Sequence, residues 1–142
     1  MINTKDVIRM RVPYPSISDK LAVNSHMYIC KQADMPAYEF IKCQTLKPYM
    51  LSKEVFRHYV DEEADTSRNP FQKTTRIDCD KTFTTKNVLY DDGLKTTTRP
   101  DICQELFDDV IEELNTDGYR IVDVNEEELA GINPLIVKIE SM

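Results

Sequence analysis

Alternating apolar and polar positions in the first part of the chain predict β-strands. Apolar residues recur close to every second position over residues 6–12, and two prolines then interrupt the segment. A period of two that ends in strand-breaking prolines is typical of a strand. The apolar runs 27–30 and 38–43, joined by the connection 33–37, predict two more strands paired as a hairpin.

The clearest alternation lies further along, over residues 74–85. Ile77 and Phe83 fall on one side of this segment and mostly polar residues on the other, which predicts a strand with one buried and one solvated face. Residues 88–90 predict a short further strand. The charged segment 51–70, which lies between the predicted hairpin and the strand over 74–85, fits either one short helix or a long functional loop. The pattern does not choose between them.

The spacing of apolar residues changes to a helical period after residue 98. Thr98 is suited to cap a helix and Pro100 to its first turn, so we expect an amphipathic helix over 98–116. An acidic extension over 117–142 then contains two strand-like apolar runs. The chain is therefore expected to form one domain over 1–142, mainly β or α+β, with its β core over residues 5–92.

Charge divides the chain into two unequal parts. The net charge is −7, yet residues 1–100 hold 16 Lys and Arg against 13 acids, a net of +3, and residues 101–142 hold 2 against 12, a net of −10. The mildly basic β core keeps RNA binding open as a function. No apolar run is long enough to span a bilayer and the polar start does not resemble a signal peptide, so we expect a cytoplasmic protein without membrane contact.

Motifs for common enzyme classes are absent. There is no glycine-rich phosphate loop, no H-E-x-x-H and no G-x-S-x-G sequence, so the chain offers no support for nucleotide hydrolysis, zinc proteolysis or α/β-hydrolase chemistry. The four cysteines are widely spaced, with no C-x-x-C pair, which favours buried reduced thiols over a metal site; two disulfides stay arithmetically open. We expect neither a metal nor a cofactor.

The order of elements resembles a known family. A strand, a proline-containing loop, two strands ending in Gln44-Thr45, the run Thr75–Phe83 and an amphipathic helix are similar to the plasmid-maintenance growth-inhibitor family of MazF, PemK and Kid toxins. The resemblance spans about residues 5 to 115 and is most specific in the arginine, apolar, aspartate, apolar and lysine pattern after Thr75. It implies a small SH3-like β-barrel that cleaves messenger RNA and forms a dimer.

The resemblance also implies where the RNA-cleaving residues lie. Family members carry an arginine, commonly in an Arg-Pro pair, before the second strand and a Thr or Ser after the third strand. Thr45 takes the second role, but residues 22–27 contain no arginine, which leaves His26 or Lys20 for the first. Cleavage through the 2′-hydroxyl needs a base, a phosphate-holding cation and a hydrogen-bond donor, so we predict His26, Thr45 and Lys47 as catalytic residues.

A basic, donor-rich stretch at residues 67–76 predicts a second contact with RNA. Arg68, Lys73 and Arg76 are suited to hold phosphates while Phe71 stacks on a base, and Lys20 adds a further cation. The alternative is an ordinary polar loop whose Phe71 points inward. Likewise, the acidic residues of the helix and extension are either a solvated face or a cover that lies over the basic β core.

Two functions from different classes follow from the sequence. The first is a PemK/MazF-like protein that binds single-stranded RNA, acts as a metal-independent endoribonuclease toxin, forms a homodimer and is bound by an antitoxin or another protein. The second is a catalytically inactive SH3-like barrel that serves as a protein-interaction or regulatory module of a mobile element. The absence of the Arg-Pro pair favours the second.

Overall fold

The computed structural model describes residues 1–51 and 56–139, and these residues are mainly β. The strands are β1 (Val7–Met10), β2 (His26–Asp34), β3 (Ala37–Thr45), β4 (Tyr59–Glu62), β5 (Thr75–Asp78), β6 (Lys81–Lys86), β7 (Val88–Tyr90), β8 (Arg120–Asp123) and β9 (Ile136–Lys138). The helices are α1 (Lys20–Val23), α2 (Gln104–Leu114) and α3 (Glu126–Ile132), with 3₁₀ turns η1 (Pro48–Leu51) and η2 (Asp92–Leu94). The expected hairpin of β2 and β3 is confirmed.

Strand β3 is the centre of the larger sheet. It pairs with β2 along one edge, while its other edge pairs first with β6 and then with β5. Strand β1 lies outside β2, β4 lies outside β5, and β8 runs parallel to β6. The remaining strands, β7 and β9, form a separate antiparallel pair. Because β3 is paired on both edges, its ends are fixed by neighbours from distant parts of the sequence.

The larger sheet has open edges. Within the described ranges, the strand pairings run from β1 to β4 with β6 and β8 as a branch, and they do not close the sheet into a barrel. The outer edge of β1 meets isolated bridges between Ile8 and Lys95 and between Asp6 and Asp101 instead of a full strand. The coarse expectation of a mainly β protein is confirmed.

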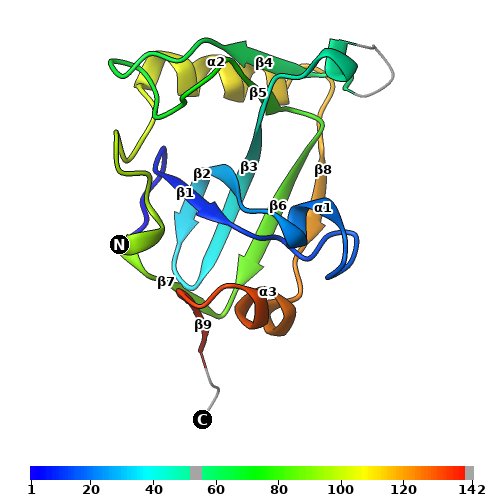
Figure 1. The fold of residues 1–142 in the computed structure, drawn as a ribbon, viewed down its shortest axis with the longest axis vertical. Helices are drawn as coiled ribbons and strands as arrows, with labels where there is room; N and C mark the ends of the chain where they lie inside the picture. Colours follow the sequence, from blue (N-terminus) through cyan, green and yellow to red (C-terminus); the bar gives the residue numbers. More distant parts are fainter. Residues whose placement is uncertain (52–55, 140–142) are drawn as a thin grey trace.

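Two hydrophobic clusters lie on opposite faces of the larger sheet, because consecutive strand residues such as Val7 and Ile8 belong to different clusters. Helix α2 buries Leu106, Val110 and Leu114 against Ile77 and other sheet residues near β4 and β5. Helix α3 and β9 contribute Leu129 and Ile136 to the cluster on the other face, and α3 lies at the opposite end of the molecule from α2 (Figure 1). Burial of these faces is the main stabilising term, since each fully buried aliphatic side chain contributes roughly 1.5–3 kcal/mol.

The predicted helix over 98–116 is shorter at its start than expected. Helix α2 begins at Gln104, with the Cys103 thiol accepting from the Leu106 backbone N–H as the N-cap. The preceding residues are not helical because they pair with the N-terminal segment: the Ile102 N–H donates to the Lys5 carbonyl, and Asp101 bridges Asp6. Tertiary pairing therefore overrides the capping pattern at Thr98.

The strand predicted over 74–85 is divided, and both of its faces are buried. It forms β5 and β6 with a break at Cys79 and Asp80, where the Asp80 carboxylate accepts from the backbone N–H groups of Arg57 and His58. All four residues of β5 are buried, Asp78 completely. The prediction of one solvated face is therefore wrong, because β4, η1 and Phe56 cover the polar side.

Besides the 3₁₀ turns, three described elements were not expected from the sequence, namely α1, β4 and α3. Part of the charged segment 51–70 forms β4, an edge strand on β5, and the acidic run at residues 126–128 begins α3, capped by the Asn125 side chain. The hypothesis of a short helix in 51–70 also concerns residues 52–55, which lie outside the described residues. All four cysteines are free thiols, and three of them are buried. Within the described residues, no helix has the length and apolar composition to cross a membrane.

A buried charge cluster occupies the covered polar side of the sheet. The Lys81 ammonium lies 2.9 Å and the Lys42 ammonium 3.6 Å from one carboxylate oxygen of Asp78, which is fully buried. Burial lowers the pKa of Lys42, and the Asp78 charge opposes that shift. One carboxylate thus compensates two cations between β3, β5 and β6.

Removing that carboxylate should destabilise the fold. In Asp78→Asn the buried Lys42 loses its counter-charge, and we expect the free energy of unfolding to fall by about 3–5 kcal/mol. Urea unfolding followed by circular dichroism measures the change. The matched control is Asp92→Asn, whose exposed carboxylate is paired with the N-terminus and Lys95; it should change the free energy of unfolding little, because solvent screens exposed ion pairs. An equal decrease in the free energy of unfolding in the two variants would contradict a structural role for the cluster.

Candidate functional site

The three predicted catalytic residues lie at one end of the sheet. His26 is the first residue of β2, Thr45 is the last residue of β3, and Lys47 follows two positions later. The antiparallel register pairs Met27 with Cys43, so the start of β2 lies beside the end of β3. Sequence reasoning placed these residues at strand ends, and the strand pairing brings the ends together.

Two adjoining depressions meet at this end of the sheet. The first, the Arg9 depression, has a volume of about 290 Å³ and is lined by Arg9, Ser25, His26, Met27, Cys43, Gln44, Thr45, Lys47, Phe71, Gln72, Lys73 and Thr75. The second, the Tyr49 depression, has a volume of about 370 Å³ and is lined by Lys20, Asn24, Ser25, His26, Gln44, Thr45, Lys47, Tyr49 and Met50. His26, Thr45 and Lys47 line both. We call the two together the β2–β3 cleft.

The β2–β3 cleft is electropositive. Four exposed cations line it, namely Arg9, Lys20, Lys47 and Lys73. Their side chains make no ion pair or hydrogen bond with any residue in the described ranges. None of the described residues that line either depression is acidic, in a chain with 25 Asp and Glu. Such a cleft attracts anions and offers charge that is not already neutralised.

His26 is held as a neutral imidazole with one nitrogen available. Its Nδ1 lies 3.0 Å from the Asn24 carbonyl oxygen, which can only accept, so Nδ1 carries the proton and Nε2 keeps its lone pair. Burial lowers the pKa of His26; the hydrogen bond to Asn24 opposes this shift, and the nearby Lys42 charge adds to it. At neutral pH the side chain is therefore suited to accept a proton.

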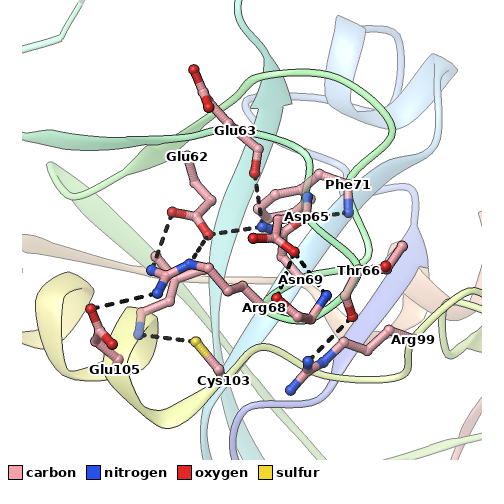
Figure 2. A network of polar contacts seen from close by, with 12 residues as sticks. Glu62, Glu63, Asp65, Thr66, Arg68, Asn69, Phe71, Arg99, Cys103 and Glu105 are labelled. Atoms are coloured by element: carbon pink, nitrogen blue, oxygen red, sulfur yellow. Dashed lines mark hydrogen bonds and ion pairs between the residues drawn. The ribbon is translucent and has the colours of Figure 1, made fainter.

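Phe71 does not present its ring for stacking. The side chain is only 4% exposed and belongs to the hydrophobic cluster beneath α2, although its edge forms part of the Arg9 depression. Its backbone N–H donates to the fully buried Asn69 side chain at 3.0 Å (Figure 2). The prediction that Phe71 stacks on a base is wrong, and the alternative of an inward-pointing phenylalanine is confirmed.

Arg68 forms ion pairs with the end of β4 and with α2. Its Nε donates to Glu62 at 2.8 Å, and its Nη1 lies 3.5 Å from Glu105 of α2, as Figure 2 shows. The Glu62 carboxylate also accepts from Asn69 at 2.8 Å. Arg68 lines neither depression, so the structure places this predicted RNA-binding residue in a network that fixes the loop 62–71 against α2.

Arg76 is buried, and its guanidinium bonds to groups of the protein itself. It is 3% exposed, donates to both carboxylate oxygens of Asp61 at 2.8 Å, and lies 3.6 Å from the centre of the Tyr59 ring. Its Nη1 also donates to the Met50 carbonyl. The prediction that Arg76 contacts RNA is therefore wrong: strand β4 and η1 cover its side of the sheet and supply partners for its guanidinium.

The remaining predicted RNA-binding residues, Lys20 and Lys73, do line the cleft, one in each depression. Sequence reasoning missed Arg9 and Tyr49. Arg9 lies within a predicted strand with alternating polar residues. Such residues are usually assigned to the solvated face of a sheet, so Arg9 was not predicted as a site residue. Tyr49 follows Pro48 in a segment without periodicity, and only its proximity to Lys47 could have indicated it.

The acidic extension does not cover the cleft. Asn133 accepts from the Arg11 backbone N–H at 2.8 Å and donates to the Arg11 carbonyl at 2.7 Å, which fixes the end of α3 beside β1. Asp123 bonds to Thr84 and Glu127 to Lys138. No described acidic residue of the extension lines either depression, so the hypothesis of an acidic cover is wrong for these residues.

His58 lies between the sheet and the end of α2. Its Nδ1 is 3.1 Å from Glu113 and its Nε2 is 2.9 Å from Asp117. The hydrogen bond to Glu113 is the main reason that the pKa of His58 is raised, and the charge of Asp117 adds to it. His58 therefore stabilises the connection between β4 and α2 when it is protonated and lies outside the β2–β3 cleft.

No group of three or more His, Cys, Asp and Glu side chains in the described ranges is arranged to hold a metal ion. Comparison with known proteins adds no identification: no protein-family model, curated protein or solved structure matches the chain. The function must therefore be argued from the chemistry of the β2–β3 cleft.

The two histidines should titrate on opposite sides of the ordinary value of about 6.5. The chain contains only two, so their ring resonances are separable by NMR, and His26→Gln assigns them by removing one. We expect the pKa of His26 below that value, because burial disfavours its charged form, and the pKa of His58 above it.

The same shifts set the dependence of stability on pH. His58 should contribute stability below the pKa of the unfolded state, and this contribution should vanish as the pH rises through the higher folded-state pKa. His58→Gln should therefore destabilise the protein more at about pH 6 than at about pH 8 in urea unfolding. A loss that does not change with pH would contradict the ion pairs of His58 with Glu113 and Asp117.

Proposed function

We propose that the protein binds single-stranded RNA in the β2–β3 cleft and cleaves it as an endoribonuclease. The observation that carries this proposal is the clustering of four cations without described ion-pair partners around His26 and Thr45, in a lining without described acidic residues. Each lysine or arginine that contacts a polyanion strengthens its binding, because counterions are released from the phosphates. Hydroxyl and amide donors between the cations suit phosphate and ribose oxygens.

The chemistry follows from the form in which His26 is held. Its Nε2 accepts the proton of a ribose 2′-hydroxyl as that oxygen attacks the adjacent phosphorus. The bond from phosphorus to the 5′-oxygen breaks, and the leaving oxygen takes a proton from the Lys47 ammonium or from water. Lys47 and the Thr45 hydroxyl stabilise the charge on the pentacoordinate phosphate. The products are a 2′,3′-cyclic phosphate and a 5′-hydroxyl end.

The resemblance to the MazF, PemK and Kid toxins supports a more specific proposal. In it, the open sheet is a variant of the SH3-like barrel, and the protein is a growth inhibitor of a toxin-antitoxin system. It then acts in the cytoplasm, forms a homodimer, and is neutralised by an antitoxin. His26 replaces the arginine of that family as the proton acceptor, with Lys20 and Lys47 beside it as cations.

A second function is a catalytically inactive module that binds a protein partner. The lack of an arginine in residues 22–27 favours it, as does the exposed acidic face of α2, which carries Glu105, Asp108, Asp109 and Glu112. In such a module, His26 would not act as a proton acceptor. Cleavage of RNA by the purified protein distinguishes the two functions.

Binding should depend on the cations of the cleft. We expect Lys47→Gln to weaken binding of a fluorescent single-stranded RNA and to reduce the slope of log K against log salt by about 0.7, the value for one lost phosphate contact. Fluorescence anisotropy over a salt series measures both. The matched control is Lys86→Gln, since Lys86 is also exposed and unpaired among the described residues but lies at the other end of β3. An identical slope in both variants would contradict binding in the cleft.

Cleavage should require His26. We expect His26→Gln to lower the rate by about 10²–10⁴-fold, the range for loss of a general base, while RNA affinity changes little. Gel electrophoresis of end-labelled RNA, with identification of the cyclic phosphate, measures the reaction. His58→Gln serves as the control and should cleave at the normal rate. If the wild-type protein binds RNA but leaves it intact, the enzymatic part of the proposal is lost and RNA binding alone is retained.

A further inference from the structure

Tyr49 is an exposed aromatic residue among the cations of the cleft. Its side chain is 54% exposed, and it lines the Tyr49 depression together with Lys20 and Lys47. The other strongly exposed tyrosine among the described residues, Tyr59, differs because the Arg76 guanidinium lies over its ring at 3.6 Å. Tyr49 has no such cover, so its ring is available to a ligand.

The position of Tyr49 is fixed by its neighbour. Met50 is only 1% exposed, its backbone N–H donates to the Lys47 carbonyl at 2.9 Å, and its carbonyl accepts from Arg76. Arg76 is held in turn by Asp61. Arg76 is thus a positioning residue: through Met50 it fixes the turn that presents Tyr49. A preordered ring loses little conformational entropy when a flat ligand stacks on it.

The two depressions lie around the end of β3. Gln44 and Thr45 are consecutive strand residues, so their side chains point to opposite faces of the sheet. Both line each depression, and Arg9 and Lys73 lie in one depression while Tyr49 and Lys20 lie in the other. A ligand that occupies both must therefore be extended and must pass His26, Thr45 and Lys47 on the way.

We propose that Tyr49 is the stacking platform for one unpaired nucleobase of a polynucleotide that runs from the Tyr49 depression into the Arg9 depression. The phosphate next to that base lies at Lys47, and the following phosphate lies between Arg9 and Lys73. This inference rests on the proposed RNA binding. It adds the path of the strand across the cleft and a binding site for one base. An aromatic ring beside unpaired cations suits a nucleobase and its phosphates, because every base has a π-face and its backbone is anionic.

The absence of tryptophan from the chain gives a direct test. Tyr49→Trp introduces a single indole, and stacking of a base on it should quench its fluorescence when a short oligoadenylate is added. The same oligomer with abasic sites, which keeps the ribose-phosphate backbone, should leave the fluorescence unchanged. Leu89→Trp is the control, because Leu89 is 46% exposed on β7, away from the cleft, and should show no quenching with either oligomer.

Affinities measured by anisotropy complete the test. Tyr49→Ala should bind oligoadenylate about tenfold more weakly, whereas Tyr49→Phe should bind as the wild type does, since stacking needs only the ring. With the abasic oligomer the wild type and Tyr49→Ala should bind equally. Arg76→Gln should reproduce the loss of Tyr49→Ala for oligoadenylate, provided that circular dichroism shows it folded.

The outcomes separate this inference from the proposed function. If Lys47→Gln weakens binding of oligoadenylate but Tyr49→Ala does not, RNA binding stands and the stacking platform is overturned. Equal losses for oligoadenylate and the abasic oligomer in Tyr49→Ala would also overturn it, since they would show a contact with the backbone. If the wild-type protein binds neither oligomer, the proposed function itself is wrong.

Discussion

The double pairing of β3 is the constraint on which the rest of the structure depends. One strand is hydrogen-bonded to β2 along one edge and to both β6 and β5 along the other, so its final residues lie at the meeting point of three chain segments. Cys43 and Phe71 belong to the hydrophobic cluster beneath α2, whereas Thr45, the last residue of β3, stays exposed. Polar side chains of β2, β3 and the segment after β3 therefore meet at the rim of that cluster.

The distribution of ion pairs explains why the cleft is electropositive in an acidic protein. Several cations elsewhere are matched with acids: Arg68 with Glu62, Arg76 with Asp61, and both Lys42 and Lys81 with Asp78. These pairs tie neighbouring strands and the loop before β5 together. The cations of the cleft have no described partner, so their field is directed at solvent, where it acts on a ligand without first breaking an internal ion pair.

Local sequence patterns predicted the elements whose burial follows from their own periodicity, such as β1, the hairpin of β2 and β3, and the apolar face of α2. They failed where long-range pairing decides the outcome. Residues 98–102 satisfy a capping pattern but form bends and a bridge to the N-terminal segment, and the polar side of β5 is buried because β4, itself unpredicted, covers it. The same reason explains the site: strand ends indicated His26 and Thr45, whereas Phe71 and Arg76 were misassigned because their partners are distant in sequence.

The acidic remainder of the molecule bears on how a polyanion would approach. Residues 101–142 carry 12 acids and 2 cations, and none of their described residues lines the cleft. Exposed charges act over roughly 8 Å at physiological ionic strength, so this surface repels nucleic acid locally without neutralising the cleft. Contact with the RNA ligand that we propose is thereby confined to one end of the sheet. In this proposal, affinity depends on a few cations and on stacking, so an extended single strand is a better ligand than a rigid duplex.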